Sequence, residues 1–252
     1  MSESPGPVER RLVALLRGGP IHLTLIDPEK SPGAAAADVA RKAVELGTHA
    51  ILLGGSTGIS PDGMGAAATA VKRAVDVPVV IFPEGPSSLT PAADAVLFMS
   101  LLNSRNLNLV IRAHARSAPV VRQMGLEPIP MGYLIVAPGM RVGEVGEADA
   151  VPREEPATAA GYALAAEYLG MRFVYLEAGS GAPSPVPAAM VEAVTTAVRV
   201  PVIVGGGIRS GHDAAPILAA GAKVLVTGSV TEEEGLGRGY RSVLEEVARA
   251  RR

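Results

Sequence analysis

The sequence has 252 residues, of which 48% are hydrophobic and 19% charged, so it can bury a sizeable core. A formal net charge of -2, without a dense Lys/Arg cluster, argues against a nucleic-acid partner. The lack of cysteine excludes disulfides and thiolate catalysis, and no apolar run approaches the roughly 18 residues of a membrane span. We therefore expect a cytoplasmic protein without a transmembrane segment.

The first part of the chain alternates apolar runs, which predict buried strands, with Ala-rich helical segments. After a leading helix at about 8–17, the expected strands are residues 21–26, 50–53, 79–82 and 95–98. The expected helices between the first three strands are residues 34–46 and a segment that ends near residue 75. Between residues 82 and 95, Pro83, Pro86 and Pro91 lack N–H donors, so we expect a loop there instead of a helix.

The alternation resumes in the second part of the chain. The expected strands are residues 129–136, 173–176, 202–204 and 224–226, and the expected helices are residues 104–123, 156–169, 187–198, 210–220 and a charged helix ending at 252. The segment 137–155 is rich in Gly, Pro and charge, and a connection of that length inside a compact domain is usually functional.

Eight continuous apolar strands that alternate with helices predict a parallel sheet buried on both faces. Eight such units in about 250 residues have the size of a (β/α)8 barrel. A doubly wound open sheet is the alternative, but no Gly-x-Gly-x-x-Gly motif follows the first strand. We predict an α/β fold with one domain over residues 1–252. It would be a modified TIM barrel, from about residue 21, in which a loop replaces the helix of the third unit.

Three late strands end in glycine, which suggests one shared ligand. Gly206, Gly207, Gly228 and Ser229 follow the last two strands, beside Gly179, Ser180 and Gly181. Backbone N–H groups without side chains suit a phosphate, and the helix that begins near Ser210 would add its positive end. The alternative is that these glycines serve only tight turns between strand and helix.

Two acidic strand ends carry the predicted chemistry. Asp27 ends the first strand and Ser56 follows the second, a pair suited to Mg²⁺ that also binds oxygens of a polyphosphate. The alternative, equally weighted, is that Asp27 shapes a turn and Ser56 caps a helix. Glu177 could accept a proton from a hydroxyl of a bound phosphate ester, or it could be a structural partner of Arg209 or Arg141.

Other classes of site receive no support from the sequence. The four histidines show no metal-ligand spacing, and His22 and His49 begin strands at the far end of the predicted barrel, where a structural role is expected. There is no Gly-x-Ser-x-Gly nucleophile elbow and no Walker loop, so covalent catalysis is not indicated.

The chain resembles the geranylgeranylglyceryl phosphate synthase family of prenyltransferases. The matching stretches span nearly the whole chain in register: they are residues 22–30 (HLTLIDPEK), 53–58 (LGGSTG), 98–106 (FMSLLNSRN), 131–133 (MGY), 152–153 (PR), 167–172 (EYLGMR), 175–182 (YLEAGSGA), 205–211 and 227–229 (TGS). The resemblance implies a barrel without its third helix. It also implies Mg²⁺-dependent transfer of a prenyl group, from geranylgeranyl diphosphate to the C3 hydroxyl of sn-glycerol 1-phosphate, in membrane lipid biosynthesis.

The resemblance also assigns roles to residues. Asp27 and Ser56 would bind Mg²⁺, and Glu177 would orient and deprotonate the attacking hydroxyl. Phe98, Met99 and Tyr133 are candidates for an apolar groove that holds the prenyl tail, although each could equally be a core residue. The residues implied in binding glycerol phosphate are Tyr175, Leu176, Glu177, Ala178, Gly179, Ser180, Gly181, Gly206, Gly207, Gly228 and Ser229. The resemblance further implies a homo-oligomer, either a dimer or a hexamer.

The chain departs from the family pattern at two places. Another branch carries a lysine two residues before the metal aspartate, where this chain has Leu25, and Lys30 is the candidate to replace that cation. The loop after the third strand reads Phe82-Pro83-Glu84-Gly85 where Phe-Pro-Gly-Asn is expected.

Three rival functions remain open from the sequence. The first is the same reaction with another donor or acceptor, such as heptaprenyl diphosphate or 3-phosphoglycerate. The second is a phosphosugar isomerase with similar glycine loops, although Asp27 has no obvious acid/base counterpart near Val136. The third is a phosphate-binding barrel without catalysis, which the combination of Asp27, Ser56 and Glu177 disfavours.

Overall fold

The strands form a closed parallel barrel in the computed structural model, which describes residues 5–55, 60–228 and 236–252. The first strand pairs with both the second and the eighth, which closes the ring. The strands are β1 (Ile21–Ile26), β2 (Ala50–Leu53), β3 (Val79–Ile81), β4 (Ala95–Leu101), β5 (Glu127–Ile135), β6 (Phe173–Glu177), β7 (Val202–Gly205) and β8 (Val224–Thr227). The predicted α/β class and (β/α)8 barrel are confirmed.

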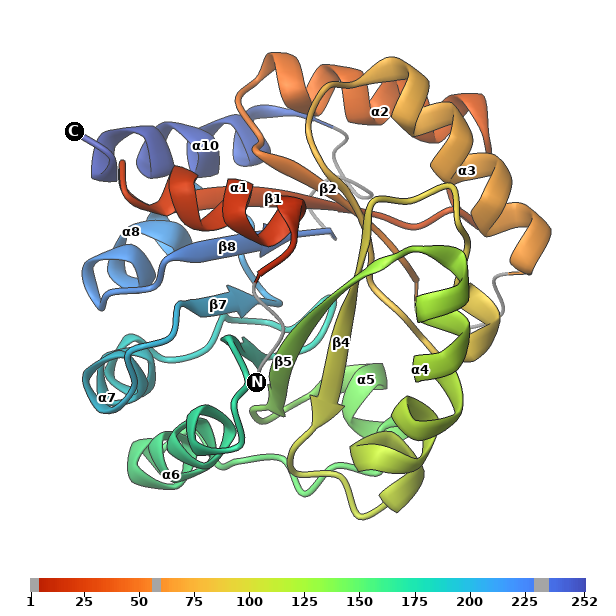
Figure 1. The fold of residues 1–252 in the computed structure, drawn as a ribbon. Coiled ribbons are helices and arrows are strands. Elements are labelled where there is room, and N and C mark those ends of the chain that lie inside the picture. The colour runs from red at the N-terminus through yellow and green to blue at the C-terminus, as the bar shows by residue number, and fades with distance from the viewer. Residues whose placement is uncertain (1–4, 56–59, 229–235) are drawn as a thin grey trace.

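Helices surround this barrel on its outer side (Figure 1). The described helices are α1 (Pro7–Leu16), which lies across one end of the barrel, α2 (Ala34–Glu45), α3 (Pro61–Ala74), α4 (Ala113–Met124), α5 (Met140–Val145), α6 (Pro156–Tyr168), α7 (Ala188–Ala197), α8 (Gly211–Ala219) and α10 (Arg238–Ala250). Of the helices in the described ranges, none combines the length and apolar character needed to cross a membrane.

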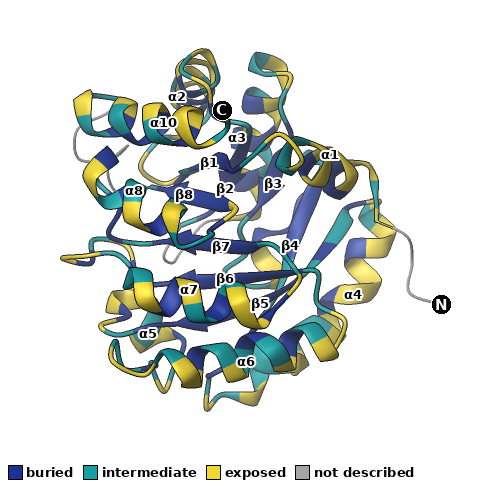
Figure 2. Ribbon diagram, turned by 90° about the vertical axis from the view of Figure 1, so that its left-hand side faces the viewer, coloured by how far each residue is buried: buried dark blue, intermediate teal, exposed yellow. Residues whose placement is uncertain are grey.

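The strands are buried on both faces because alternate side chains enter two different cores. Along β1, Ile21 and Leu23 join the cluster inside the barrel, whereas Ile26 joins the cluster shared with α2 and α3. Figure 2 shows the result: the strands are buried, and exposed positions lie on the outer sides of the helices. This explains why the sequence shows continuous apolar runs without alternation.

The amino-terminal end of the barrel is closed by α1. Val8 and Leu12 pack into the cluster inside the barrel. The carboxylate of Glu127, at the start of β5, accepts hydrogen bonds from the N–H groups of Val8 at 2.7 Å and Glu9 at 2.8 Å. This carboxylate therefore satisfies the free amides of the helix start, in place of an N-cap side chain.

The third unit lacks an α-helix, as predicted. The whole segment between β3 and β4 is described, and its helical content is one 3₁₀ turn, η1 (Pro86–Ser88). The prolines of this segment cannot donate to a helical ladder. The outer side of β4 is therefore covered by this loop, by α4 and by the helical turn that precedes α4, which leaves room for the cavity described below.

Two predictions for helical segments were wrong, and β4 ends at Leu101 instead of residue 98. The helix expected over residues 104–123 begins at a π-helical turn, η2 (Asn108–Arg112), because Ser104 Oγ and Asn106 Oδ1 accept local backbone N–H groups and hold the preceding loop. It continues through Pro119 as α4. The segment 137–155, expected to be irregular, contains the six-residue helix α5, which the low helix propensity of its glycines concealed.

A polar network lies between the barrel and the helix layer, close to the last glycine loop. His22 is fully buried, and its ring nitrogens are 2.9 Å from the hydroxyls of Thr48 and Thr227. Thr24 Oγ1 lies 2.7 Å from the hydroxyl of Tyr240 on α10. Burial lowers the pKa of His22 to about 3, with a further contribution from His49, so this histidine is neutral in the folded protein. The structural role predicted for it agrees with these contacts.

We predict that His22→Gln flattens the dependence of the melting temperature on pH between about 6.5 and 4. The pKa of His22 is depressed in the fold, so its contribution to stability is complete above the unfolded value and is lost as the pH falls toward about 3. Calorimetry across this range measures the slope. The control is His212→Gln, because His212 is exposed, and it should keep the wild-type slope. Equal slopes in all three proteins would contradict the prediction.

Candidate functional site

The carboxyl ends of β6, β7 and β8 bring most of the predicted ligand-binding residues together. A small cavity of about 40 Å³ is lined by Tyr175, Glu177, Ser180, Gly206, Gly207 and Gly228, with Arg209 beside them. The side chains of Leu176 and Ala178 instead join the core between the barrel and the outer helices. Ser56 and Ser229, predicted to bind metal and phosphate, lie outside the described residues.

Glu177 is the central polar group of this site, and it is only 6% exposed. Its Oε1 accepts the N–H of Gly179 at 2.7 Å, and its Oε2 lies 3.3 Å from the hydroxyl of Tyr133. The hydroxyl of Tyr175 also hydrogen bonds to this carboxylate. The described structure therefore holds Glu177 with two tyrosines and a backbone amide.

Burial raises the pKa of Glu177 above its ordinary value, and the hydrogen bonds from Gly179, Tyr175 and Tyr133 offset part of this rise. Burial and the neighbouring carboxylate also raise the pKa of both tyrosines, so their hydroxyls remain protonated donors. A carboxylate with a raised pKa is a stronger base than one in water. In its carboxylate form, Glu177 can therefore accept a proton from a bound hydroxyl.

The glycines at the carboxyl end of β7 are needed for close approach of the backbone to the Glu177–Tyr175 pair. A Cβ on Gly206 would lie 2.3 Å from Oε1 of Glu177, and one on Gly205 would lie 2.1 Å from the hydroxyl of Tyr175. Gly206 also has a φ of +80°, which favours glycine. These glycines thus make space for the Glu177–Tyr175 pair, a role beyond the tight turn that the sequence offered as an alternative.

The positive end of α8 is less available than the sequence suggested. Ser210 and Asp213 form a capping box, and the Asp213 carboxylate accepts the N–H groups of Arg209 and Ser210 at 3.0 Å. The N–H of Gly211 donates to Ser242 Oγ at 2.9 Å. Protein groups therefore already occupy these amides, and an anion here would depend on the loop glycines instead.

Asp27 lies at the mouth of the barrel and is 7% exposed. Its Oδ1 accepts the N–H of Glu29 at 2.9 Å, so the turn-forming role considered for it is present. A Cβ on Gly55 would lie 2.6 Å from the same oxygen, so the backbone after β2 closely approaches this carboxylate. No cluster of three or more His, Cys, Asp or Glu within the described ranges could hold a metal alone. A hard cation that takes its other oxygens from water and substrate phosphates fits this donor set.

A second, larger cavity of about 370 Å³ begins at the same place and extends outward. Glu177, Ser180, Leu25 and Gly228 line both cavities, so the two meet beside the buried carboxylate. Its polar end also includes Asp27, Lys30, Glu84 and Arg141. The remainder of the wall is mostly apolar and includes Phe82, Pro86, Leu89, Val96, Leu97, Phe98, Met99, Leu101, Leu109, Val121, Tyr133, Val142 and Val145.

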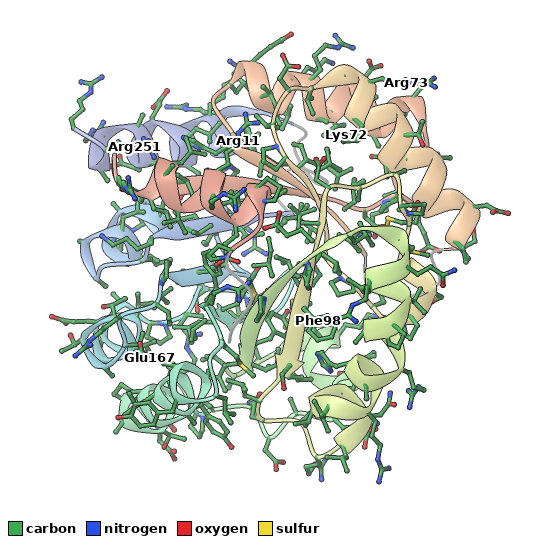
Figure 3. The ribbon with its side chains drawn as sticks, in the orientation of Figure 1. Arg11, Lys72, Arg73, Phe98, Glu167 and Arg251 are labelled. Atoms are coloured by element: carbon green, nitrogen blue, oxygen red, sulfur yellow. The ribbon has the colours of Figure 1, made fainter. Side chains whose placement is uncertain are left out.

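This apolar part passes between β4 and α4, where the third unit lacks its helix. Phe98, labelled in Figure 3, packs with Val96 and Val121 on the side of β4 that faces α4. Its ring meets that of His114 edge to face, with centroids 4.9 Å apart. All three residues predicted for an apolar groove, namely Phe98, Met99 and Tyr133, line the cavity.

Sequence reasoning missed the polar role of Tyr133, which it offered only as an apolar wall or core residue. Tyr133 pairs in register with Tyr175 on the neighbouring strand, and their rings are 5.1 Å apart. The register of parallel strands brings both hydroxyls to Glu177, and no local sequence motif encodes that register. The available signal was that a tyrosine stands two positions before the last residue of both β5 and β6.

The comparisons with known proteins agree with this arrangement. The PcrB family matches residues 14–248. A protein named geranylgeranylglyceryl phosphate synthase from Methanothrix thermoacetophila is 49% identical over 91% of each chain, and one of the same name from Pyrococcus furiosus is 46% identical over 97% of each. A crystal structure of (S)-3-O-geranylgeranylglyceryl phosphate synthase from Thermoplasma acidophilum, in complex with sn-glycerol-1-phosphate, superposes with a TM-score of 0.92. It is 41% identical and covers 97% of this chain and 99% of its own.

We predict that Gly206→Ala lowers the free energy of unfolding by about 1–3 kcal/mol, since the new methyl group meets Glu177 and the backbone is strained at positive φ. Urea unfolding measures the change. The matched control is Gly161→Ala in α6, where a Cβ would meet nothing within 4 Å, and we expect it to stabilise by about 0.5–1 kcal/mol. A Gly206→Ala protein as stable as wild type would show that this contact is easily relieved.

Proposed function

Because the chain belongs to the PcrB family, we propose that it is a prenyltransferase that joins the geranylgeranyl group of its diphosphate to the C3 hydroxyl of sn-glycerol 1-phosphate. The product is an ether, the first ether bond of an isoprenoid phospholipid. The observation that carries this proposal is the position of Glu177, where a small glycine-lined cavity meets a large apolar one.

The two cavities match the two substrates in chemistry. The small cavity offers Ser180 and the loops of Gly206, Gly207 and Gly228, which suit a phosphate bound through backbone N–H groups. The large cavity offers a mostly apolar wall behind the polar end that contains Asp27 and Lys30, which suits a prenyl tail attached to a diphosphate. The reacting atoms of the two substrates would then meet beside Glu177.

The reaction at this point needs one base and no covalent intermediate. Glu177 accepts the proton of the C3 hydroxyl while the hydroxyl oxygen attacks C1 of the prenyl group. The new C–O bond forms as the bond from C1 to the diphosphate oxygen breaks, and the diphosphate leaves with that electron pair. The raised pKa of Glu177 favours the transfer, and Tyr133 and Tyr175 hold its carboxylate in place.

We propose that Asp27 helps to hold Mg²⁺, with Ser56 as a second candidate outside the described residues. The donor set fits, because one buried carboxylate leaves most of the coordination shell to water and to the diphosphate. A bound Mg²⁺ would stabilise the negative charge that develops on the diphosphate as it leaves. Lys30 and Arg141 line the same polar end and would add positive charge toward that group.

We predict that purified protein with Mg²⁺ forms an ether from geranylgeranyl diphosphate and glycerol 1-phosphate, and that Glu177→Gln lowers kcat by about 10²-fold or more. The assay would also include farnesyl and heptaprenyl diphosphates as alternative donors, and glycerol 3-phosphate and 3-phosphoglycerate as alternative acceptors. Since Tyr133 lowers the pKa of Glu177, Tyr133→Phe should shift the acid limb of the kcat profile to higher pH. A product from another pair would change the substrate assignment, and near-normal turnover by Glu177→Gln would remove Glu177 as the base.

We predict that EDTA abolishes product formation and that Asp27→Asn lowers kcat by about 10²-fold at saturating Mg²⁺. Asp27→Asn should also bind Mn²⁺ more weakly in the presence of inorganic diphosphate. This binding is measured from the relaxation of water protons. Asp38→Asn is the matched control, because Asp38 is an exposed residue of α2 paired with Arg41. Full activity of Asp27→Asn, or of the wild type in EDTA, would contradict the metal role.

A further inference from the structure

Three loops after consecutive strands contact one another mainly through their backbones. The N–H of Gly139, after β5, donates to the carbonyl of Ala178 at 3.1 Å. A Cβ on Gly179 would lie 2.6 Å from the carbonyl oxygen of Gly139. After β7, a Cβ on Gly207 would lie 2.6 Å from the carbonyl oxygen of Ser184 and 2.8 Å from the nitrogen of Pro185. The spacing of these loops therefore sets the shape of the small cavity.

Arg153 connects two of these loops from outside the cavities. It lies between α5 and α6 and is absent from the linings of both cavities described above. Its Nη1 donates to the carbonyl of Ala137 at 3.2 Å, and its Nη2 donates to the carbonyl of Pro185 at 2.7 Å. The planar guanidinium thus holds two carbonyls at a fixed separation, which the single ammonium of a lysine cannot reproduce.

The carbonyls of Ala137 and Pro185 each belong to a loop that contacts a residue of the site. Ala137 is two residues before Gly139, which packs against Gly179, and Gly179 donates its N–H to Glu177. Pro185 packs against Gly207, which lines the small cavity. A shift of either carbonyl would move the Glu177 side of the cavity relative to the glycine side.

We propose that Arg153 is a positioning residue that sets the width of the glycerol phosphate site by fixing the loops after β5 and β6. This inference rests on the proposed function, in which that cavity binds the glycerol phosphate. It concerns chiefly the acceptor site, since β4, α4 and the loop after β3 build most of the apolar wall of the larger cavity, to which α5 adds Val142 and Val145.

Arg172 provides a matched control at the opposite end of the barrel. Its Nε donates to the carboxylate of Glu9 at 2.6 Å, which links the residue before β6 to α1. It is, like Arg153, a partly buried arginine that joins two segments. Replacing Arg172 should lower the stability of the protein and leave substrate binding unchanged.

The test compares Arg153→Lys, Arg153→Ala and Arg172→Lys by steady-state kinetics and by calorimetric binding of glycerol 1-phosphate. We expect Arg153→Lys to weaken glycerol 1-phosphate binding and raise its KM by about tenfold, the effect of losing one charge-assisted hydrogen bond. The KM for geranylgeranyl diphosphate should stay within about twofold. Added guanidinium should restore part of the affinity of Arg153→Ala. Arg172→Lys should lower the melting temperature and leave both KM values unchanged.

The outcomes separate this inference from the proposed function. Wild-type protein that binds glycerol 1-phosphate but forms no ether would overturn the reaction and leave the binding comparison to decide the role of Arg153. Unchanged glycerol 1-phosphate affinity in Arg153→Lys, or an equal loss in Arg172→Lys, would overturn the inference. A wild type that does not bind glycerol 1-phosphate would overturn both.

Discussion

The burial of the Glu177 carboxylate constrains the end of the barrel at which the strands have their carboxyl ends. A charged group that is 6% exposed is unstable unless hydrogen bonds replace its lost water, and Glu177 obtains them from Gly179, Tyr133 and Tyr175. Each partner imposes a further demand on the chain. The register of β5 and β6 must align the two tyrosines, and position 206 must be glycine to make room for the carboxylate oxygen. The hydrogen bonds that Glu177 needs therefore determine which residues surround the site.

The opposite end of the barrel shows a different design. There α1 covers the interior core, Glu127 caps α1, and Arg172 pairs with Glu9, whose side chain is 2% exposed. These contacts join distant parts of the chain and face no cavity described here. The contacts that stabilise the amino-terminal end are thus separate from the two cavities, which lie at the carboxyl ends of the strands, where barrels of this kind usually carry their site. The segment between β3 and β4 has no α-helix, and β4 is therefore open to the large cavity.

The sequence predicted those features that depend on local patterns. Apolar runs predicted the eight strands, the prolines from Pro83 to Pro91 predicted the missing helix, and strand-end glycines predicted the place of the small cavity. It could not predict contacts that depend on register or on backbone acceptors. The hydroxyl of Tyr133 reaches Glu177 only through strand pairing, and Arg153 binds two carbonyls that have no side-chain signature. The homo-oligomer, the metal and the roles of Ser56 and Ser229 stay predictions.

The electrostatics of the junction between the cavities follow from one apolar residue. Leu25 lines both cavities and packs against Gly228, where a Cβ would lie 3.3 Å from its Cδ2. A lysine at this position, as in another branch of the resembling family, would place a cation near Glu177 and lower its pKa. Leucine leaves desolvation as the dominant influence on that carboxylate. Lys30, which is exposed, and Arg141 line the polar end of the larger cavity. In the proposed reaction, Glu177 would therefore act as the base without a lysine at position 25, and the cations that would face the diphosphate would be Lys30 and Arg141.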